Sequence, residues 1–470
     1  MRWQRLFPLI LAVLSLSVTA RGDEVLTLGE VLASVQKNYP PLLAALQERN
    51  IADADVLAAL GRFDLVTKAR AESSRLGYYE YEHFEAGVEQ YTPYQGLSYY
   101  GSYAKGSGET PSYYGNLLTR SLGEYRGGLK LPLLEGRNID YRRADLQKAR
   151  LGVRLAELSI DQQRLAINQA ATRRYWDWVA AGQRFQVAQK VLDIAMARDT
   201  QLREAAKLGQ IPDFEVLDNE RIILQRRSQL VEAERGQQMA AFELSLYYRD
   251  AAGNPRIATV GQTPAGFPPP EQLDEAKLTD DIENALNRRP DLARYQQQKA
   301  QVGLDRQLAE NQRLPSLDFG VSYYQDTGTI NRTLQGPKEL RTSLTWELPF
   351  QRRAATGKLQ SAQAKLNQLD QRERYQRDQV VTEVRDAYSA VITAFKRVGV
   401  IRDEVATTRR VEAGERVRFD LGDTNLFTLN LRELATAEAS IREVNAYADY
   451  FRAFAVYDLT IAQALARTNR

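Results

Sequence analysis

The fold is decided by residues 380–408, which read VVTEVRDAYSAVITAFKRVGVIRDEVATT. Apolar residues recur in this stretch at alternating steps of four and three, which is the spacing of a heptad seam along one side of an α-helix. We therefore expect a long helix that packs against neighbouring helices. The seam stays apolar until its last member and comprises Val380, Val384, Ala387, Val391, Ala394, Val398, Ile401, Val405 and Thr408.

Two short segments upstream of this helix alternate between apolar and polar residues. Residues 317–323 read LDFGVSY, and residues 343–348 read SLTWEL. A period of two is typical of a β-strand with one apolar and one polar face. In the first half of the chain, residues 63–72 and 129–131 alternate less regularly. We therefore expect four strands per chain.

Landmarks of the second half recur in the first half in the same order, which indicates two tandem copies of one unit. We place the copies at residues 21–250 and 271–470, and we interpret the Pro- and Gly-rich residues 251–270 as the linker. Each copy is expected to contain a helix, two strands, a helix of about 60 to 70 residues, a glycine turn and a last helix. The paired landmarks are NYPPL at 38–42 with NRRPDL at 287–292, LPL at 131–133 with LPF at 348–350, and KLGQ at 207–210 with DLGD at 420–423.

The long helix of the first copy carries two seams. One seam includes Ile160, Ile167 and Trp178, and the other, on the opposite side, includes Leu151 and Leu155. A helix with seams on opposite sides is flanked by two neighbours, so such helices form a closed wall when they are repeated around a ring. A long antiparallel coiled coil would account for the seams equally well, although it would not account for the strands.

The strands need something to cover their apolar face. Four strands cannot close a barrel, and an open sheet leaves its edges exposed. If several chains pool their strands into one closed cylinder, lipid covers the apolar face and water covers the polar face. We therefore expect a mainly α chain with a small β part that contributes to a shared transmembrane barrel.

The composition excludes several classes of protein. The chain has 470 residues, of which 26% are charged, a mean hydropathy of -0.47, no Cys and a single His, His83. Without Cys there is no disulfide, thiolate nucleophile or Cys-ligated metal, and one His nearly excludes histidine-based catalytic and metal sites. The net charge of +3 offers no polycationic surface to nucleic acid. We expect no enzymatic activity, no cofactor and no metal site.

The one uninterrupted apolar stretch, residues 7–18, is too short to cross a bilayer of ~30 Å as a helix, which excludes a multispan helical membrane protein. Arg2 and Arg5 precede it, and Val18-Thr19-Ala20 follows as a small-residue cleavage site. This is the layout of a secretory signal peptide, which we assign to residues 1–20. A buried N-terminal helix is the alternative.

Taken together, these features resemble the TolC-type outer membrane factors. The resemblance rests on the signal peptide, the tandem repeat, the helix–strand–strand–helix order, and a glycine turn near each helix tip. Two short motifs add to it, Arg289-Pro290-Asp291-Leu292 and Leu314-Pro315-Ser316-Leu317. The resemblance covers about residues 24–466.

The resemblance implies a homotrimer in the outer membrane of a Gram-negative bacterium, with a twelve-stranded barrel and a large helical tunnel in the periplasm. It further implies a passive exit duct of a tripartite efflux pump or type I secretion system, which docks onto a periplasmic adaptor and an inner-membrane transporter. A soluble periplasmic adaptor or scaffold is the alternative. An adaptor would carry a compact barrel domain beside one hairpin, whereas this chain has two equivalent hairpins.

The resemblance also implies a pore constriction at the periplasmic helix tips. Matching the turn glycines places the constriction at Glu215, Phe419, Thr424, Thr428 and Leu431. The family often has Arg at the Thr424 position and acids at the Thr428 and Leu431 positions, so an acidic ring is in doubt. Asp420 and Asp423 are candidates to supply the acidic ring instead. The alternative is that these two carboxylates only solvate a helix tip.

The resemblance also implies that these turns dock onto the adaptor. The candidate docking residues are Gly209, Ile211, Pro212, Gly422, Asn425 and Leu426. The alternative is an ordinary helix end and helix start, because Gly is a common C-cap and Pro a common first helical residue.

One stretch of the first copy stands apart in composition. Ten of the 24 Tyr lie between residues 78 and 114, among many Gly and Ser. We interpret the stretch as a long loop, whose Tyr side chains would suit an outer loop or an interfacial aromatic belt. His83 lies within it and is expected to be an ordinary loop residue.

Overall fold

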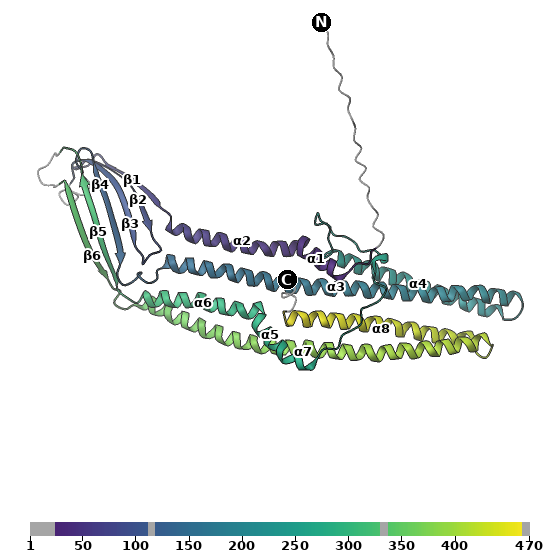
Figure 1. Cartoon of the computed structure of the whole chain (residues 1–470). Helices are drawn as coiled ribbons and strands as arrows, with labels where there is room; N and C mark the ends of the chain where they lie inside the picture. The colour runs from purple at the N-terminus through teal and green to yellow at the C-terminus, as the bar shows by residue number, and fades with distance from the viewer. Residues whose placement is uncertain (1–23, 111–117, 330–336, 463–470) are drawn as a thin grey trace, which may run out of the picture. The chain divides into compact units, whose positions relative to one another are not determined.

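A computed structural model describes residues 24–110, 118–329 and 337–462. The predicted signal peptide, residues 1–20, lies outside the described residues. The two long helices that the seams predict are present with 67 and 68 residues, α3 and α7. The α-helices are α1 (Leu28–Asn38), α2 (Pro40–Leu60), α3 (Tyr141–Lys207), α4 (Asp213–Ser245), α5 (Leu278–Arg288), α6 (Pro290–Asn311), α7 (Arg353–Asp420) and α8 (Leu426–Thr460) (Figure 1).

The described chain divides into two compact units, each of which takes segments from both halves of the sequence. The first, here called the helical unit, draws on the described parts of residues 1–39, 170–271 and 393–452. The second, here called the sheet unit, draws on the described parts of residues 40–169, 272–392 and 453–470. The proposed boundaries of the two sequence copies stay a prediction.

Prolines interrupt the first helical segment of each copy. α1 ends before Pro40 and α5 ends before Pro290, and the preceding Tyr39 and Arg289 are extended, with ψ of 113° and 127°. The residue before a proline is pushed out of the helical region by the proline ring. The single helix expected at each of these places is therefore two helices.

The strands form one antiparallel sheet in the order β1–β2–β3–β4–β5–β6, in which every strand pairs with its neighbour in the sequence (Figure 1). The described chain therefore has six strands, and the expectation of four is wrong. The strands are β1 (Val66–Ser74), β2 (Tyr81–Tyr91), β3 (Ser98–Gly108), β4 (Glu124–Pro132), β5 (Ser316–Asp326) and β6 (Lys338–Glu347).

The two additional strands, β2 and β3, lie in the Tyr-rich stretch that we expected to be a loop. The composition of this stretch conceals an alternation. Phe84, Ala86 and Val88 alternate with Glu85 and Gly87, and Tyr is itself a strand-favouring residue. His83 is consequently a buried strand residue, 6% exposed, and not a loop residue.

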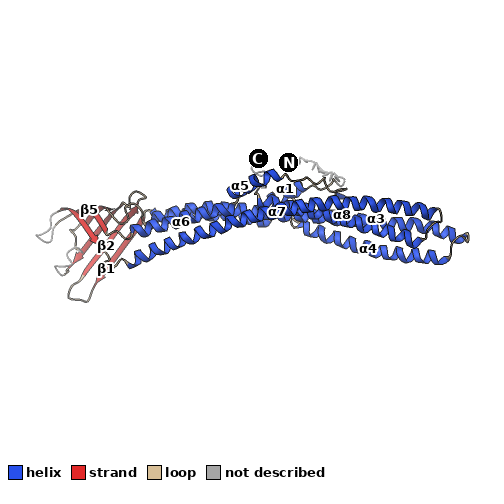
Figure 2. Ribbon diagram, turned by 90° about the horizontal axis from the view of Figure 1, so that it is seen from below, coloured by secondary structure: helices blue, strands red, loops and turns tan. Residues whose placement is uncertain are grey.

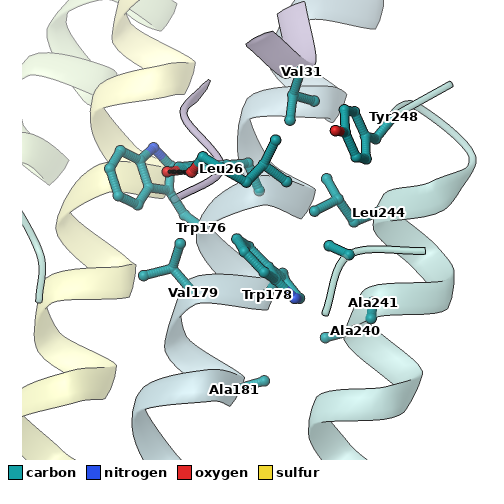
Figure 3. Close-up of a cluster of buried hydrophobic side chains, with 12 residues drawn as sticks. Leu26, Val31, Trp176, Trp178, Val179, Ala181, Ala240, Ala241, Leu244 and Tyr248 are labelled. Atoms are coloured by element: carbon teal, nitrogen blue, oxygen red, sulfur yellow. Dashed lines mark hydrogen bonds between the residues drawn. The ribbon is translucent and has the colours of Figure 1, made fainter. Parts of the chain in front are cut away.

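The core of the helical unit lies where α3 packs against α4 and the N-terminal segment (Figure 3). Trp178, Val179 and Leu244 are fully buried there, together with Val31 of α1. The Tyr175 hydroxyl donates a hydrogen bond of 2.9 Å to the Leu26 carbonyl, which ties the chain before α1 to α3.

Figure 2 shows the helices of the sheet unit, in blue, leading away from the strands, in red. Polar side chains join these helices. Lys148 of α3 pairs with Asp305 of α6 at 2.9 Å, and Glu48 of α2 accepts a hydrogen bond from Gln163 of α3 at 2.7 Å. The α7 seam is buried as predicted, with Val380, Val384 and Val391 fully inaccessible in this unit.

No helix among the described residues combines the length and apolar character needed to cross a membrane.

Candidate functional site

The candidate site comprises the turn between α3 and α4 and the turn between α7 and α8, both in the helical unit. Gly209 and Gly422 adopt left-handed φ angles of 70° and 77° at equivalent places in the two turns. The Gln210 amide donates to the Ala205 carbonyl at 2.9 Å, and the Asp423 amide donates to the Arg418 carbonyl at 2.8 Å. These bonds satisfy the last carbonyls of α3 and α7 in the Schellman pattern, which requires a residue tolerant of positive φ.

Polar side chains reinforce the second turn. The Asn425 side-chain oxygen accepts hydrogen bonds from the Thr428 amide and the Thr428 hydroxyl, both at 2.9 Å. Arg418 pairs with Asp423 at 3.0 Å across the turn. Asp423 and Thr428 therefore have local structural partners in the single chain, and Asn425 caps α8.

The predicted constriction residues gather around these turns. Glu215 lies in the first turn of α4, and Phe419 and Asp420 lie at the end of α7. Thr424 precedes α8, while Leu431, 50% exposed, lies in its second turn.

The predicted docking residues differ in exposure. Gly209, Pro212, Gly422 and Asn425 are exposed, and Ile211 is half-buried. Leu426 is only 3% exposed and packs inside the hairpin, so its side chain does not reach the surface of the single chain.

A buried cluster of charges lies next to these turns. Glu433 of α8, 3% exposed, pairs with Arg198 of α3, Arg226 of α4 and Arg416 of α7. The Arg226 and Arg416 contacts measure 2.9 and 3.0 Å. Asn430, one turn earlier on α8, accepts a further hydrogen bond of 2.6 Å from Arg198. One carboxylate thus joins all four long helices, and we call these four charged residues the Glu433 cluster.

The electrostatics of the Glu433 cluster favour the ionised carboxylate. Burial alone would raise the pKa of Glu433, but the hydrogen bonds and charges of Arg198 and Arg226 outweigh burial and lower it. A carboxylate between several guanidinium groups remains charged at neutral pH.

The sequence interpretation missed the Glu433 cluster, although a signal was present. Arg198 lies three residues after the buried Ala195, on the same side of α3, and Glu433 follows the buried Leu429 by four residues and the buried Leu426 by seven. Charged residues at seam positions lie between helices, where an ion is stable only with a partner.

An apolar groove of about 560 Å³ adjoins the cluster within the helical unit. Val187 and Val191 of α3, Ile222 of α4, and Leu431 and Leu434 of α8 line it. On α4, Leu217, Leu224 and Val231 follow one another at intervals of seven and are 63%, 59% and 64% exposed. The spacing is that of a heptad position, so these three residues form an exposed apolar stripe along α4.

Among residues 24–110, 118–329 and 337–462, no group of three or more His, Asp or Glu side chains could hold a metal ion.

No protein-family model matches the sequence, and no curated protein matches it. Solved structures match over nearly the whole chain. The open state of the Neisseria gonorrhoeae MtrE outer membrane channel aligns with a TM-score of 0.67 and 14% identity, covering 92% of this chain and 88% of the other. The Campylobacter jejuni CmeC outer membrane channel aligns with a TM-score of 0.62 and 14% identity, covering 94% and 89%.

A third match is the outer membrane protein VceC of Vibrio cholerae, with a TM-score of 0.63 and 13% identity, covering 92% of this chain and 95% of the other. The chain therefore has the fold of these outer membrane channel proteins.

Proposed function

We propose that this protein is a passive exit duct in the outer membrane of a Gram-negative bacterium. Three copies pool their strands into a lipid-embedded barrel, and their helices form a tunnel in the periplasm. The duct catalyses no reaction and needs no cofactor. The observation that carries the proposal is the exposed apolar face of the sheet, on a fold shared with outer membrane channels.

Strand pairing assigns the side chains to the two faces of the sheet. Phe319 lies opposite both Leu344 and Leu131, and Leu317 lies opposite Trp346. This face is apolar and open: Leu344 is 65% and Trp346 62% exposed. Its remaining large exposed side chains are Phe84, Val88, Tyr99, Tyr125, Leu129, Phe319, Tyr323 and Leu340.

The opposite face is polar and carries several ion pairs. Lys130 pairs with Asp318 at 3.0 Å, and Arg126 pairs with Glu124 and with Glu85. In a soluble scaffold the apolar face would lie in water. In a barrel it contacts lipid while the polar face lines an aqueous lumen, which is the arrangement that transmembrane strands adopt.

A second copy of the chain accounts for the stripe on α4. Leu217, Leu224 and Val231 are not covered by any helix that the structure describes, and a heptad stripe is complementary to another helix. In the proposed trimer, α4 packs against a helix of the next copy and the tunnel wall closes.

The helix tips serve as gate and docking surface in this proposal. Glu215, Phe419, Asp420, Asp423, Thr424, Thr428 and Leu431 narrow the periplasmic end of the pore, and the Glu433 cluster holds the tips together. The turn residues Gly209, Ile211, Pro212, Gly422 and Asn425 contact a periplasmic adaptor, which connects the duct to an inner-membrane transporter.

Two neighbouring positions on β6 test the proposal. Leu344→Arg puts a charge on the face assigned to lipid, at a cost of ~2–4 kcal/mol near the bilayer midplane. Ser343→Arg is the matched control, because the same residue then points to the lumen. Leu344→Arg should abolish heat-modifiable trimers in the outer membrane fraction, whereas Ser343→Arg should retain them. Equal tolerance of both variants, or recovery of the unaltered protein only as soluble monomer, would refute the proposal.

A further inference from the structure

The β2–β3 hairpin is inserted into the middle of the sheet. Among the described strands, β1 pairs with β2 alone. The hairpin joins β4 and the following strands through β3. The hairpin makes eleven residue pairs internally, from Tyr81↔Gly108 to Tyr91↔Ser98. If the hairpin did not take part in the barrel wall, β1 would lose all of its backbone pairing with β2. Any barrel built from this sheet therefore includes all six strands.

The hairpin carries the same two faces as the other strands. On the apolar face, Phe84, Ala86 and Val88 continue the surface formed by Tyr99 and Leu129. On the polar face, Glu85 lies opposite Ala104 and accepts a hydrogen bond of 3.0 Å from Ser102. A hairpin in water would not need an apolar face that is continuous with the lipid-facing side of its neighbours.

The turn of the hairpin is anchored at the end of the sheet where the chain enters α3. The Thr92 amide donates to the Leu97 carbonyl at 2.9 Å, and the guanidinium carbon of Arg142 lies 3.6 Å from the centre of the Tyr91 ring. Gly96 has a φ of 72°, and a Cβ there would lie 2.6 Å from the Gly136 carbonyl. The turn is therefore packed against the start of α3.

We propose that each chain contributes six strands and that three chains close an eighteen-stranded barrel, wider than the twelve-stranded barrel that four strands per chain would give. The inference rests on the proposed trimeric duct and specifies the interface between its copies. The occupant of each free sheet edge is a second copy of this chain, β6 of one copy pairing with β1 of the next. An even number of strands makes these two edges antiparallel, as closure requires.

The pairs within one chain give the reference from which the register between two copies is measured. Following the pairs across the sheet leads from Val66 through Glu89, Tyr100, Gly128 and Ser322 to Arg341. If Arg341 of one copy then faces Glu72 of the next, the register shifts by six residues per chain, and all nine residues of β1 find partners between residues 339 and 347 of β6. In this register Glu72 faces Arg341 on the lumen side, and Ala69 lies opposite Leu344 on the lipid side.

Other shifts that keep the faces matched are less favourable. With a register shift of six residues at each of the three interfaces between copies, the shear number of the barrel equals its number of strands. The strands then tilt by ~35° from the barrel axis, which is within the range of outer membrane barrels. A shift of four would give only ~25°, and a shift of eight would pair only seven residues of β1. At a strand spacing of ~4.8 Å, the eighteen-stranded backbone cylinder is ~34 Å across, compared with ~23 Å for twelve strands.

The register is tested by cysteine pairs, because the natural chain has no Cys. In the full-length protein in bacterial outer membranes, Ala71→Cys combined with Thr342→Cys should give covalent trimers on oxidation with copper phenanthroline. Ala71→Cys with Leu340→Cys, or with Leu344→Cys, tests the shifts of four and eight and should cross-link at least tenfold less. Preferential cross-linking of either control pair overturns the register, and a ladder that ends at dimers overturns the eighteen-strand count.

Placement of the hairpin in the wall is tested by single cysteines and a membrane-impermeant thiol reagent. Ser102→Cys and Ser343→Cys should react, whereas Val88→Cys and Leu344→Cys should be protected by lipid. Equal reactivity of Val88→Cys and Ser102→Cys in trimers that protect Leu344→Cys would place the hairpin outside the barrel and refute the inference alone. Absence of any outer membrane trimer would instead refute the proposed duct, and the inference with it.

Discussion

Replacing Glu433 by Gln should loosen the helix tips by about 3 kcal/mol. The change keeps the size of the side chain but removes the charge that Arg198, Arg226 and Arg416 share. Arg198 and Arg226 are only 7% and 6% exposed, so their charges stay out of water without a counterion. Removing one partner of a buried ion pair costs ~3–5 kcal/mol, and the remaining amide hydrogen bonds place this variant at the lower end.

Hydrogen exchange measures the effect. A loss of about 3 kcal/mol corresponds to roughly 100-fold faster opening, because each 1.36 kcal/mol is a factor of ten. The acceleration should be confined to amides around residues 195–230 and 412–436. Glu438→Gln is the matched control, since this α8 carboxylate is exposed and its contact with Arg442 is 3.8 Å; the expected change is below ~1 kcal/mol. Equal exchange rates in Glu433→Gln and the unaltered protein would refute the role assigned to the cluster.

Three further predictions concern the tips and the lumen. Because folding lowers the pKa of Glu433, the ionised carboxylate stabilises the folded tips above about pH 4.5, and this stabilisation is lost as the pH falls through the pKa of the folded state. The difference in hydrogen exchange at the tips between the unaltered protein and Glu433→Gln should therefore shrink in acid. A constant difference from pH 7 to pH 3 would contradict this. Gly422→Val forces a β-branched residue to a φ of 77°, at a cost of at least ~1–2 kcal/mol, and should abolish export while leaving trimers in the outer membrane. Gly414→Ala, within α7, is the control and should retain export. Unchanged export by Gly422→Val would argue against docking at this turn. The polar face of the six strands carries eight carboxylates, Glu72, Glu85, Glu89, Glu124, Asp318, Asp326, Glu339 and Glu347, and five cationic side chains, Lys68, Arg70, Arg126, Lys130 and Arg341. A channel reconstituted in a bilayer should therefore prefer cations in a KCl gradient. An anion preference would contradict the assignment of this face to the lumen.

Much of the fold could be predicted from the sequence because its patterns are periodic. The α7 seam from Val380 to Val405 is buried as the heptad spacing predicts, and β5 and β6 contain the two alternating segments. β3 was missed because Gly, Ser and Tyr dominate it, so its apolar positions are small or only partly apolar. β2 was missed with it because both lie in the Tyr-rich stretch that was interpreted as a loop. Pairing with β1 on one side and β4 on the other makes this stretch part of the sheet.

The candidate site was predictable only in part. The turn glycines could be identified because a left-handed residue after a long helix has a composition signal of its own, as Gly209 and Gly422 confirm. The Glu433 cluster could not, because its members come from four helices and are spread over more than 230 residues of sequence. The seam position of Glu433 indicates burial between helices, but it does not identify the partners of the carboxylate.

Quenching of Trp346 by brominated phospholipid tests the central claim most directly. Trp346 projects from the apolar face of β6 and is 62% exposed, whereas Trp176 and Trp178 are buried in the helical unit. In vesicles with brominated acyl chains, the full-length protein should lose a fraction of its emission that Trp346→Phe does not lose. Equal quenching of the two proteins would show that this face does not contact lipid, and would contradict the assignment of the sheet to an outer membrane barrel.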